Sequence, residues 1–341
     1  MLTPSTRPWG AVCLVAVGIA AAAAARPLRY SVEGLSMAPG LLPGDVVVTE
    51  WFPRLPSGRA PRRFDRWIVR APDGTAAIKR LIGLPGEHVS IREGDLSIDG
   101  RSVVVPPQIL AETASLVLPS SDPSGGPCRH DVAPAIVYDD AAFAPTERRL
   151  LLPVRDVGLA AVVRMADHSP TPSLRARVGR CVIGWRPPSA GRFAVVAGRL
   201  DGHVVAACWR CQDDGGKAAH RSCLPAGMPK AWQVERPWPE EGPTDAAIDA
   251  DAAARLAVWI GDDPPVGGRE PAAAGAATGA IEEFVVWRDV LHRPAADGRE
   301  DWRLGPDEHF LLGDFPSGSR DSRHWGPLHR SALSAAVSAG H

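Results

Sequence analysis

The chain has 341 residues and a formal net charge of −1 at pH 7, and 45% of its residues are hydrophobic. A chain of this length is too long for one small domain, and its near-zero charge speaks against nucleic acid or a strongly acidic molecule as a partner. Glycine and proline number 34 each, and this abundance predicts many turns and short strands rather than a bundle of helices.

The first predicted element is an uncharged apolar stretch at 9–25, which Arg26 and Arg29 follow. As a helix it would be about 26 Å long, slightly less than the hydrocarbon core of a membrane. Two interpretations are open, a cleaved secretory signal and a retained membrane anchor. Both predict that the following domain crosses a membrane, and the flanking charges do not decide the orientation.

A β-patterned region follows at 28–105, where short apolar runs alternate with turn signals. Its last segment is expected to be a hairpin, because apolar residues alternate on both sides of the Glu-Gly pair at 93–94. An Asp-Gly pair at 99–100 supplies a further turn. The expected strands are 45–52, 66–71, 76–84 and the two arms of 88–100.

The composition changes between 106 and 283, a part that holds five of the six cysteines. Regularly spaced short strands with turn signals predict a β-sandwich here. The Asp-Gly pair at 201–202 is expected to close a hairpin. Strands are expected at 148–154, 159–165, 179–185 and 192–209, and strand-like patterns return at 281–292 and 309–314.

Ser36 is the first candidate for chemistry. It lies between apolar residues, two Pro-Gly pairs follow at 39–40 and 43–44, and the valine run at 46–48 predicts a buried strand. Because no histidine lies near it in the sequence, a nucleophilic Ser36 would need a different base.

The base predicted for Ser36 is Lys79, within an apolar strand. Lys79 and Arg80 should point to opposite faces of this strand, so one of the two should face the packed side. A lysine kept from water has a lowered pKa, and a value near 8 needs a shift of about 2 units, roughly 3 kcal/mol. A neutral amine can accept a serine proton. The alternative is that Lys79 reaches solvent from a strand edge.

A dense polar segment at 313–326 contributes the other candidates. We expect Ser319 to hydrogen-bond Lys79 and to orient its amine. Asp321 and Arg323 are spaced to lie on one side of an extended segment and to pair. The alternative is a solvated turn with a surface ion pair, worth under about 1 kcal/mol.

Three segments together indicate a family. They read "GLSMAPGLLPGDVVV" at 34–48, "AAIKRLIGLPGE" at 76–87 and "GDFPSGSRDSRHWG" at 313–326. In order and wording they resemble the sequence boxes of type I signal peptidases, which are membrane-anchored serine–lysine endopeptidases. The resemblance implies a mainly β fold with an N-terminal transmembrane helix, an antiparallel β catalytic core and a large inserted β-sandwich-like domain. The implied division is 1–27 for the anchor, 28–105 and 284–341 for the core, and 106–283 for the insert.

The resemblance also implies a role for each matching residue. Ser36 resembles the nucleophile, with its backbone N–H as an oxyanion donor, and Lys79 resembles the general base. Ser319 resembles the serine that positions the lysine amine, and Asp321 and Arg323 the pair that holds this wall of the site. The substrate-binding positions, with apolar pockets for small residues before the cut, are Val32, Gly34, Met37, Leu41, Ala77 and Ile78.

The chain departs from the family pattern at several positions. Gly34 stands where some members have a serine that adds an oxyanion donor. Gly40 replaces the usual threonine, which predicts a looser turn, and Ala77 replaces a common tyrosine, which predicts a thinner pocket wall. "GDF" at 313–315 and "FDRWIV" at 64–69 also differ. These departures put efficiency and specificity in doubt more than mechanism.

The function implied is that of signal peptidase I, which cuts signal peptides from secreted preproteins after small residues. The implied setting is the bacterial inner membrane, with a single-pass anchor and the catalytic domain on the outer, periplasmic side. Expected partners are preprotein signal peptides, the lipid bilayer and the secretion translocon, and no nucleic acid. The chemistry needs no metal and no organic cofactor.

Two alternatives stay open. One is another serine–lysine protease, such as the self-cleaving repressors; the apolar N-terminus and the lack of a DNA-binding segment speak against it. The other is a non-catalytic surface protein with a decayed peptidase core and a binding insert. The presence of all five site residues speaks against that alternative.

The cysteines allow a metal site or disulfides. Three cysteines and a histidine could form a tetrahedral zinc site, although their spacing fits no familiar zinc module. Outside the cytosol, disulfides are the simpler account. The possible pairs are Cys128 with Cys181, and two of Cys208, Cys211 and Cys223. The zinc candidates are Cys208, Cys211, His220 and Cys223.

Overall fold

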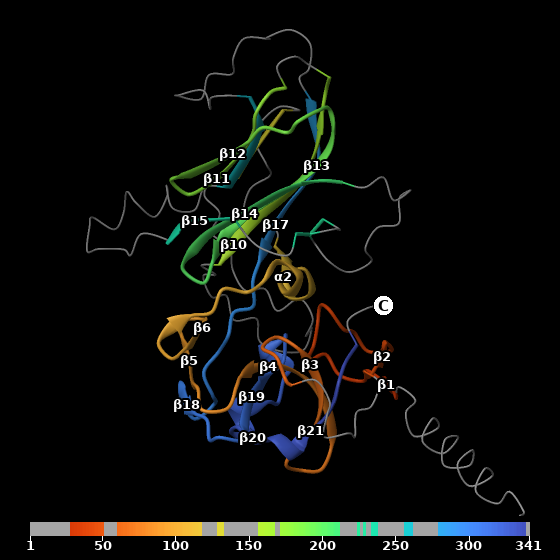
Figure 1. Ribbon diagram of the computed structural model, residues 1–341, viewed down its shortest axis with the longest axis vertical. Coiled ribbons are helices and arrows are strands. Elements are labelled where there is room, and N and C mark those ends of the chain that lie inside the picture. Colours follow the sequence, from red (N-terminus) through yellow and green to blue (C-terminus); the bar gives the residue numbers. More distant parts are fainter. Residues whose placement is uncertain are drawn as a thin grey trace, which may run out of the picture.

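The described part of the protein consists mainly of antiparallel strands, which form two halves along its long axis (Figure 1). The structure is a computed structural model. It confirms the predicted mainly β fold with antiparallel sheets. No helix in the described ranges is long and apolar enough to span a membrane, and the predicted anchor at 1–27 lies outside them. The structure describes residues 28–50, 60–117, 128–132, 156–167, 171–211, 224–225, 228–229, 233–237, 256–261 and 279–338.

The centre of the lower half is a five-stranded sheet in the order β20-β19-β4-β3-β21. Its middle strand, β4, has neighbours on both edges, and its last five residues are all buried. The strands predicted at 66–71, 76–84 and 309–314 are confirmed as β3, β4 and β19. Their bounds are β3 (Arg66–Arg70), β4 (Ala76–Gly83), β19 (Glu308–Leu312), β20 (Leu328–His329) and β21 (Leu333–Ala336).

Two smaller sheets complete the lower half, a four-stranded one in the order β18-β5-β6-β7 and the ribbon β1-β2. The predicted β5–β6 hairpin is confirmed, and its turn uses positive φ angles of 52° at Glu93 and 102° at Gly94. The strand predicted at 45–52 is shorter than expected. The bounds are β1 (Arg29–Ser31), β2 (Val46–Val48), β5 (His88–Arg92), β6 (Asp95–Ile98), β7 (Arg101–Ser102) and β18 (Asp301–Arg303).

The upper half contains a six-stranded sheet, β15-β14-β13-β10-β17-β8, and a four-stranded sheet, β12-β11-β16-β9. Both sheets contribute side chains to one buried cluster, including Leu159, Val195, Ala176 and Val258.

The strands expected at 159–165 and 179–185 and the hairpin at 192–209 are confirmed, whereas 148–154 lies outside the described residues. The bounds are β8 (Ser115–Val117), β9 (Arg129–Val132), β10 (Val157–Met165), β11 (Leu174–Val178), β12 (Cys181–Trp185), β13 (Gly191–Leu200), β14 (His203–Arg210), β15 (Gln233–Pro237), β16 (Leu256–Ile260) and β17 (Gly279–Arg288).

The helix α2 (Pro107–Thr113) lies between the two halves (Figure 1). Its Leu110 is fully buried in a cluster with Trp287 of β17. Phe64 packs against this cluster and also against the core of the lower half. The division at 105–106 and 283–284 stays a prediction, although β17 runs through the second boundary. The remaining helical turns are η1 (Pro316–Gly318), α4 (Ser322–Trp325) and η2 (Arg330–Ala332).

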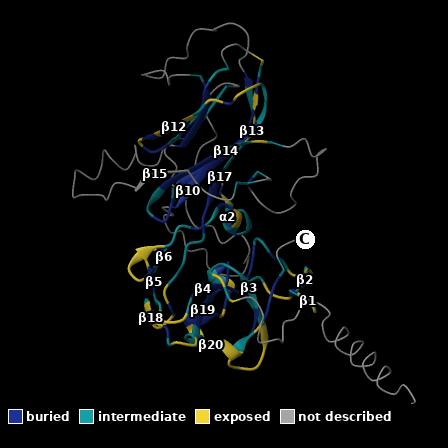
Figure 2. Cartoon of the chain, in the orientation of Figure 1, coloured by how far each residue is buried: buried dark blue, intermediate teal, exposed yellow. Residues whose placement is uncertain are grey.

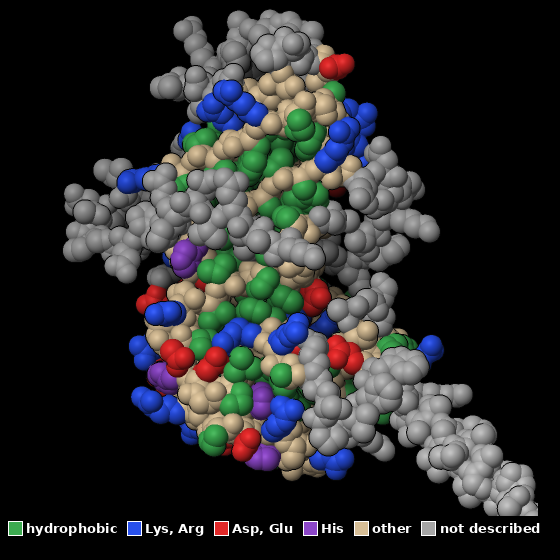
Figure 3. All heavy atoms as spheres, viewed as in Figure 1, with side chains coloured by type: hydrophobic (Ala, Val, Ile, Leu, Met, Phe, Trp, Pro, Cys, Tyr) green, Lys and Arg blue, Asp and Glu red, His purple; other side chains and the backbone are tan. Residues whose placement is uncertain are grey.

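Burial follows the strands, and most exposed residues lie in the turns and edge strands (Figure 2). Basic and acidic side chains are interspersed on the face of the lower half seen in Figure 3. This mixture agrees with the net charge of −1.

Candidate active site

Ser36 and Lys79 meet although 43 positions separate them in the sequence. Ser36 is half-buried in the turn between β1 and β2, and Lys79 lies in β4. The Lys79 amine donates to Ser36 Oγ at 2.9 Å and to the carbonyl oxygen of Ile78, also at 2.9 Å. The structure therefore brings together the two residues that the sequence singles out as nucleophile and base.

Lys79 is kept from water, since it is only 3% exposed. Burial lowers the pKa of Lys79 from 10.5 to about 8, against the opposing charges of Asp321 and Asp314 and with a smaller contribution from Arg323. Arg80 is buried as well, which differs from the expectation that one of the two neighbours would face the packed side. The reason is the central position of β4, both of whose faces are covered.

The polar segment 313–326 contacts the turn that carries Ser36 and holds it in place. The Phe315 N–H donates to the Ser36 carbonyl oxygen at 3.1 Å. A Cβ at Gly313 would lie 2.5 Å from the same oxygen and 2.2 Å from Ser319 Oγ. Only a glycine permits this approach of the two segments. Next to Ser36, Met37 is 1% exposed and anchors the turn in the core.

Ser319 does not make the contact that was expected of it. Its hydroxyl donates to Asp321 Oδ2 at 2.7 Å, and within the described ranges it forms no hydrogen bond with Lys79. The ionised carboxylate is a stronger acceptor than an amine, so it accepts the hydrogen bond from the hydroxyl. Ser319 is nevertheless buried and close to the Ser36 carbonyl through Gly313.

Asp321 and Arg323 form the expected pair, and the surface alternative is wrong because Asp321 is 0% exposed. Arg323 Nε and Nη2 donate to the two carboxylate oxygens at 2.8 Å each. Asp321 also caps α4 and accepts from the Gly313 N–H at 3.0 Å. Burial alone would raise the pKa of Asp321, but these donors lower it. An ionised carboxylate is thus fixed near the Lys79 amine.

A second buried ion pair escaped the sequence analysis. Arg80 Nε and Nη2 donate to the two oxygens of Asp314 at 2.7 and 2.6 Å, and Nη2 also donates to Glu112 of α2 at 2.9 Å. The position of Asp314, two residues after the end of the buried strand β19, is a signal that could have identified it. Nothing in the sequence pointed to Glu112. Through Arg80, the helix between the halves contacts the strand that carries Lys79.

Four of the six predicted substrate-binding residues share one apolar cluster, in which Val32, Met37 and Leu41 are buried and Ile78 is half-buried. Ala77 instead packs against a different cluster. A Cβ at Gly34 would meet no atom within 4 Å, so the turn before Ser36 borders open space.

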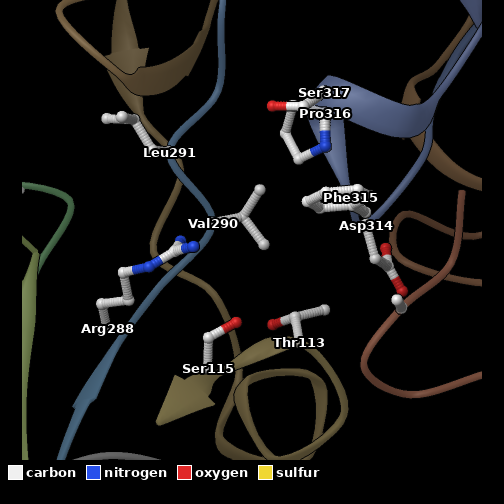
Figure 4. A pocket seen from close by; sticks show the side chains of 10 residues that line it. Thr113, Ser115, Arg288, Val290, Leu291, Asp314, Phe315, Pro316 and Ser317 are labelled. Atoms are coloured by element: carbon white, nitrogen blue, oxygen red, sulfur yellow. The ribbon is translucent and has the colours of Figure 1, made fainter. Parts of the chain in front are cut away.

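A hollow lies beside the turn that carries Ser36 (Figure 4). The Asp314 carboxylate at its wall is bound by Arg80, and Arg288 donates to the Asp289 carbonyl. Both charged groups therefore contact other parts of the protein, and the hollow separates the turn from the end of β17. Its lining residues are Ala38, Thr113, Ser115, Arg288, Val290, Leu291, Asp314, Phe315, Pro316 and Ser317.

The predicted Cys128–Cys181 disulfide is wrong, since both are free thiols. The two cysteines lie near opposite ends of β16. The Cys128 carbonyl oxygen accepts from the Ile260 N–H at one end, whereas Cys181 pairs with Val178, which in turn pairs with Leu256 at the other end. Cys208 is also a free thiol, and burial, with a smaller contribution from the neighbouring Cys211, raises the pKa of the Cys208 thiol to about 12. The zinc site stays a prediction, because its other two candidates, His220 and Cys223, lie outside the described residues.

Comparison with known proteins finds similar sequences in one family. Residues 6–124 match the family described as signal peptidase, peptidase S26. The chain is 35% identical over 79 residues to signal peptidase I V of Bacillus subtilis (strain 168), and 34% identical over 79 residues to signal peptidase I of Bacillus caldolyticus. Each match covers 23% of this chain, but 46% and 42% of the relatives. The chain therefore spans less than half the length of these relatives.

Proposed function

We propose that this chain, which belongs to the signal peptidase family (peptidase S26), is a serine endopeptidase with Ser36 as nucleophile and Lys79 as general base. One observation carries the proposal. The Lys79 amine lies 2.9 Å from Ser36 Oγ and is desolvated enough for a pKa of about 8. A surface lysine would stay protonated at neutral pH and could not accept a proton.

The chemistry begins with the neutral form of Lys79. In this form the direction of the hydrogen bond is reversed, and the Ser36 hydroxyl donates to the lone pair of the Lys79 amine. As Oγ attacks the peptide carbonyl carbon, the proton moves to Nζ, and the same proton is returned to the leaving amine. An ester acyl-enzyme remains. Lys79 takes a proton from a water molecule as that water attacks the ester carbon, and it passes this proton to Ser36 Oγ as the ester bond breaks.

The oxyanion of the tetrahedral intermediate needs a donor. The Ser36 N–H donates to no described residue and is therefore available for this role. Gly34 lacks the hydroxyl that gives some family members a second donor. The buried Asp321–Arg323 pair and Ser319 act as positioning residues, since they hold the Gly313 backbone against the Ser36 carbonyl.

The proposed substrates are the signal peptides of secreted preproteins, cut after small residues. The relatives' names support this class. The half-buried Ile78, which packs against the buried cluster of Val32, Met37 and Leu41 near Ser36, offers apolar surface for small side chains. The open space at Gly34 leaves room for an extended peptide.

The proposed location is a bacterial inner membrane with the catalytic part on the outer side, where the bilayer and the translocon present preproteins. The family match begins at residue 6 and so includes the apolar stretch 9–25. The roles of lipid and translocon follow from the family alone.

The test is an assay of the detergent-solubilised full chain on a preprotein, followed by identification of the new N-terminus. Lys79→Ala and Ser36→Ala should each reduce kcat/KM by at least about 10³-fold. Ser102→Ala, on the exposed strand β7, is the matched control and should keep wild-type activity.

Wild-type protein that binds the preprotein without cutting it would favour the alternative of a decayed peptidase core. Cutting of other proteins but no preprotein would point to another serine–lysine protease. Cutting that survives both active-site substitutions would show that the Ser36–Lys79 assignment is wrong.

A further inference from the structure

Three carboxylates meet where the two halves of the protein join. Asp95 begins β6 in the lower half, Asp156 precedes β10, and Asp201 lies in the β13–β14 turn of the upper half. One oxygen from each lies within 4.8 Å of the other two. The cluster is built from segments far apart in the sequence, and it lies outside the candidate active site.

Two of the three carboxylates are buried, since Asp156 is 8% exposed and Asp201 is 5% exposed. Asp156 Oδ1 has no hydrogen-bond partner among the described residues. A buried carboxylate oxygen without a partner is costly, and native proteins rarely leave one unless an ion or water completes it. This unpartnered oxygen is a second observation, independent of the clustering, that points to a missing ligand.

The surroundings of the cluster are also rich in negative charge. The Asp289 N–H donates to the Asp156 carbonyl at 3.0 Å, and the Asp289 side chain adds a fourth acid to the neighbourhood of Asp201. Arg199 is the cation that acts on Asp156, and the Val105 N–H donates to Asp201 Oδ2 at 3.3 Å. Burial, followed by repulsion from the neighbouring acids, raises the pKa of Asp201 well above its usual range.

We propose that Asp95, Asp156 and Asp201 bind a divalent cation of the calcium class. The three ligands are all oxygen donors, which hard cations prefer and zinc does not require. Ligands at about 2.3–2.6 Å from a calcium ion can lie up to about 5 Å apart across it. The 4.8 Å limit on the oxygen separations therefore lets all three reach one ion. Water would complete the coordination shell.

The cation would join the two halves of the protein. The Asp-Gly turn at 201–202 resembles the one at 99–100, since Asp201 and Asp99 both have positive φ angles, 47° and 51°. Asp99 is exposed, as is usual in such turns, whereas Asp201 is buried against Asp95 and Asp156. Turn geometry alone explains an aspartate at 201 but not its burial beside two other carboxylates.

The test does not depend on the peptidase proposal, because it measures binding and stability. The full chain in detergent is stripped with EDTA and titrated with CaCl2 by calorimetry, and thermal unfolding is followed with and without Ca²⁺. We expect saturable heat and a rise in the unfolding midpoint of about 3 °C at saturation. Asp156→Asn and Asp201→Asn should abolish both effects, whereas Asp99→Asn, the matched turn control, should retain them. MgCl2 should give a smaller shift.

Asp95→Asn provides a third variant at a half-exposed position, so the proposal remains testable if a buried substitution prevents folding. It should lower the affinity for Ca²⁺ at least tenfold. Absence of heat and of any shift in the wild type would overturn the proposal, and the cluster would then share protons instead of a cation. An equal Ca²⁺ shift in all three cluster variants would also overturn it, since the ion would bind elsewhere.

Discussion

The basicity of one side chain decides whether the candidate site can work. The pKa of Lys79 is about 8 because the amine is buried, although Asp321 and Asp314 oppose the shift. Because only the neutral amine can accept the Ser36 proton, we predict that kcat/KM rises with pH and levels off above about 8. A solvated lysine would instead give a rise in kcat/KM, the limb of the pH profile, centred near pH 10.5. The measurement is kcat/KM on a soluble peptide between pH 6 and 10.

The same profile tests the electrostatic account of Lys79. Asp321→Asn removes a negative charge that raises the Lys79 pKa and leaves the Arg323 charge, which lowers it. Both effects have the same sign, so the limb should move to lower pH in this variant. Asp297→Asn, at an exposed turn, is the control and should leave the limb in place. A wild-type limb near pH 10, or a shift of the variant to higher pH, would contradict the account.

At the scale of elements, three of the departures from the family pattern, Gly40, Phe64 and Phe315, lie near the helix α2. A Cβ at Gly40 would lie 2.6 Å from the carbonyl oxygen of Glu112 in α2. Phe64 packs in the cluster that contains Leu110 of α2. Phe315 lines the hollow beside the end of α2. The sequence predicted a looser turn at Gly40. In the structure the glycine instead permits a close contact between this turn and the helix.

Gly40 supplies a direct test of this contact. Gly40→Ala forces the backbone of either the turn that carries Ser36 or α2 to move, because the new Cβ meets a backbone atom of Glu112. We predict a loss of about 1–3 kcal/mol in the free energy of unfolding, the usual cost of overpacking. Gly34→Ala, in the same turn with no atom within 4 Å, should cost less than about 0.5 kcal/mol. Denaturant unfolding of both variants makes the comparison, and equal losses would show that α2 does not restrain the turn.

The sequence predicted the elements with a clear two-residue alternation, and it predicted the site where three boxes coincide. The β5–β6 and β13–β14 hairpins were correct because an Asp-Gly or Glu-Gly pair defines each turn. Contacts between segments that are distant in the sequence could not be predicted from such local patterns. Ser319 donates to Asp321 instead of Lys79, and Glu112 reaches Arg80 from α2. Such contacts depend on how the sheets pack, and no local pattern encodes them.

At the scale of the whole molecule, the two halves are connected by three kinds of contact. The buried Leu110–Trp287 cluster supplies apolar packing. The salt bridge from Arg80 to Glu112 links α2 to the sheet that contains Lys79. The proposed cation site adds a third connection at the two hairpin turns. These contacts should make the halves unfold together, even though each has its own hydrophobic core.

This coupling can be measured by scanning calorimetry of the full chain. We predict one transition for the wild type and two for Leu110→Ala, because a cavity of this kind costs about 2–5 kcal/mol where the halves meet. Leu159→Ala is the matched control, since this leucine is equally buried at 0% exposure but belongs to the core of the upper half alone. It should lower the midpoint of a single transition. Two separate transitions in the wild type, or a split in Leu159→Ala alone, would show that α2 does not couple the halves.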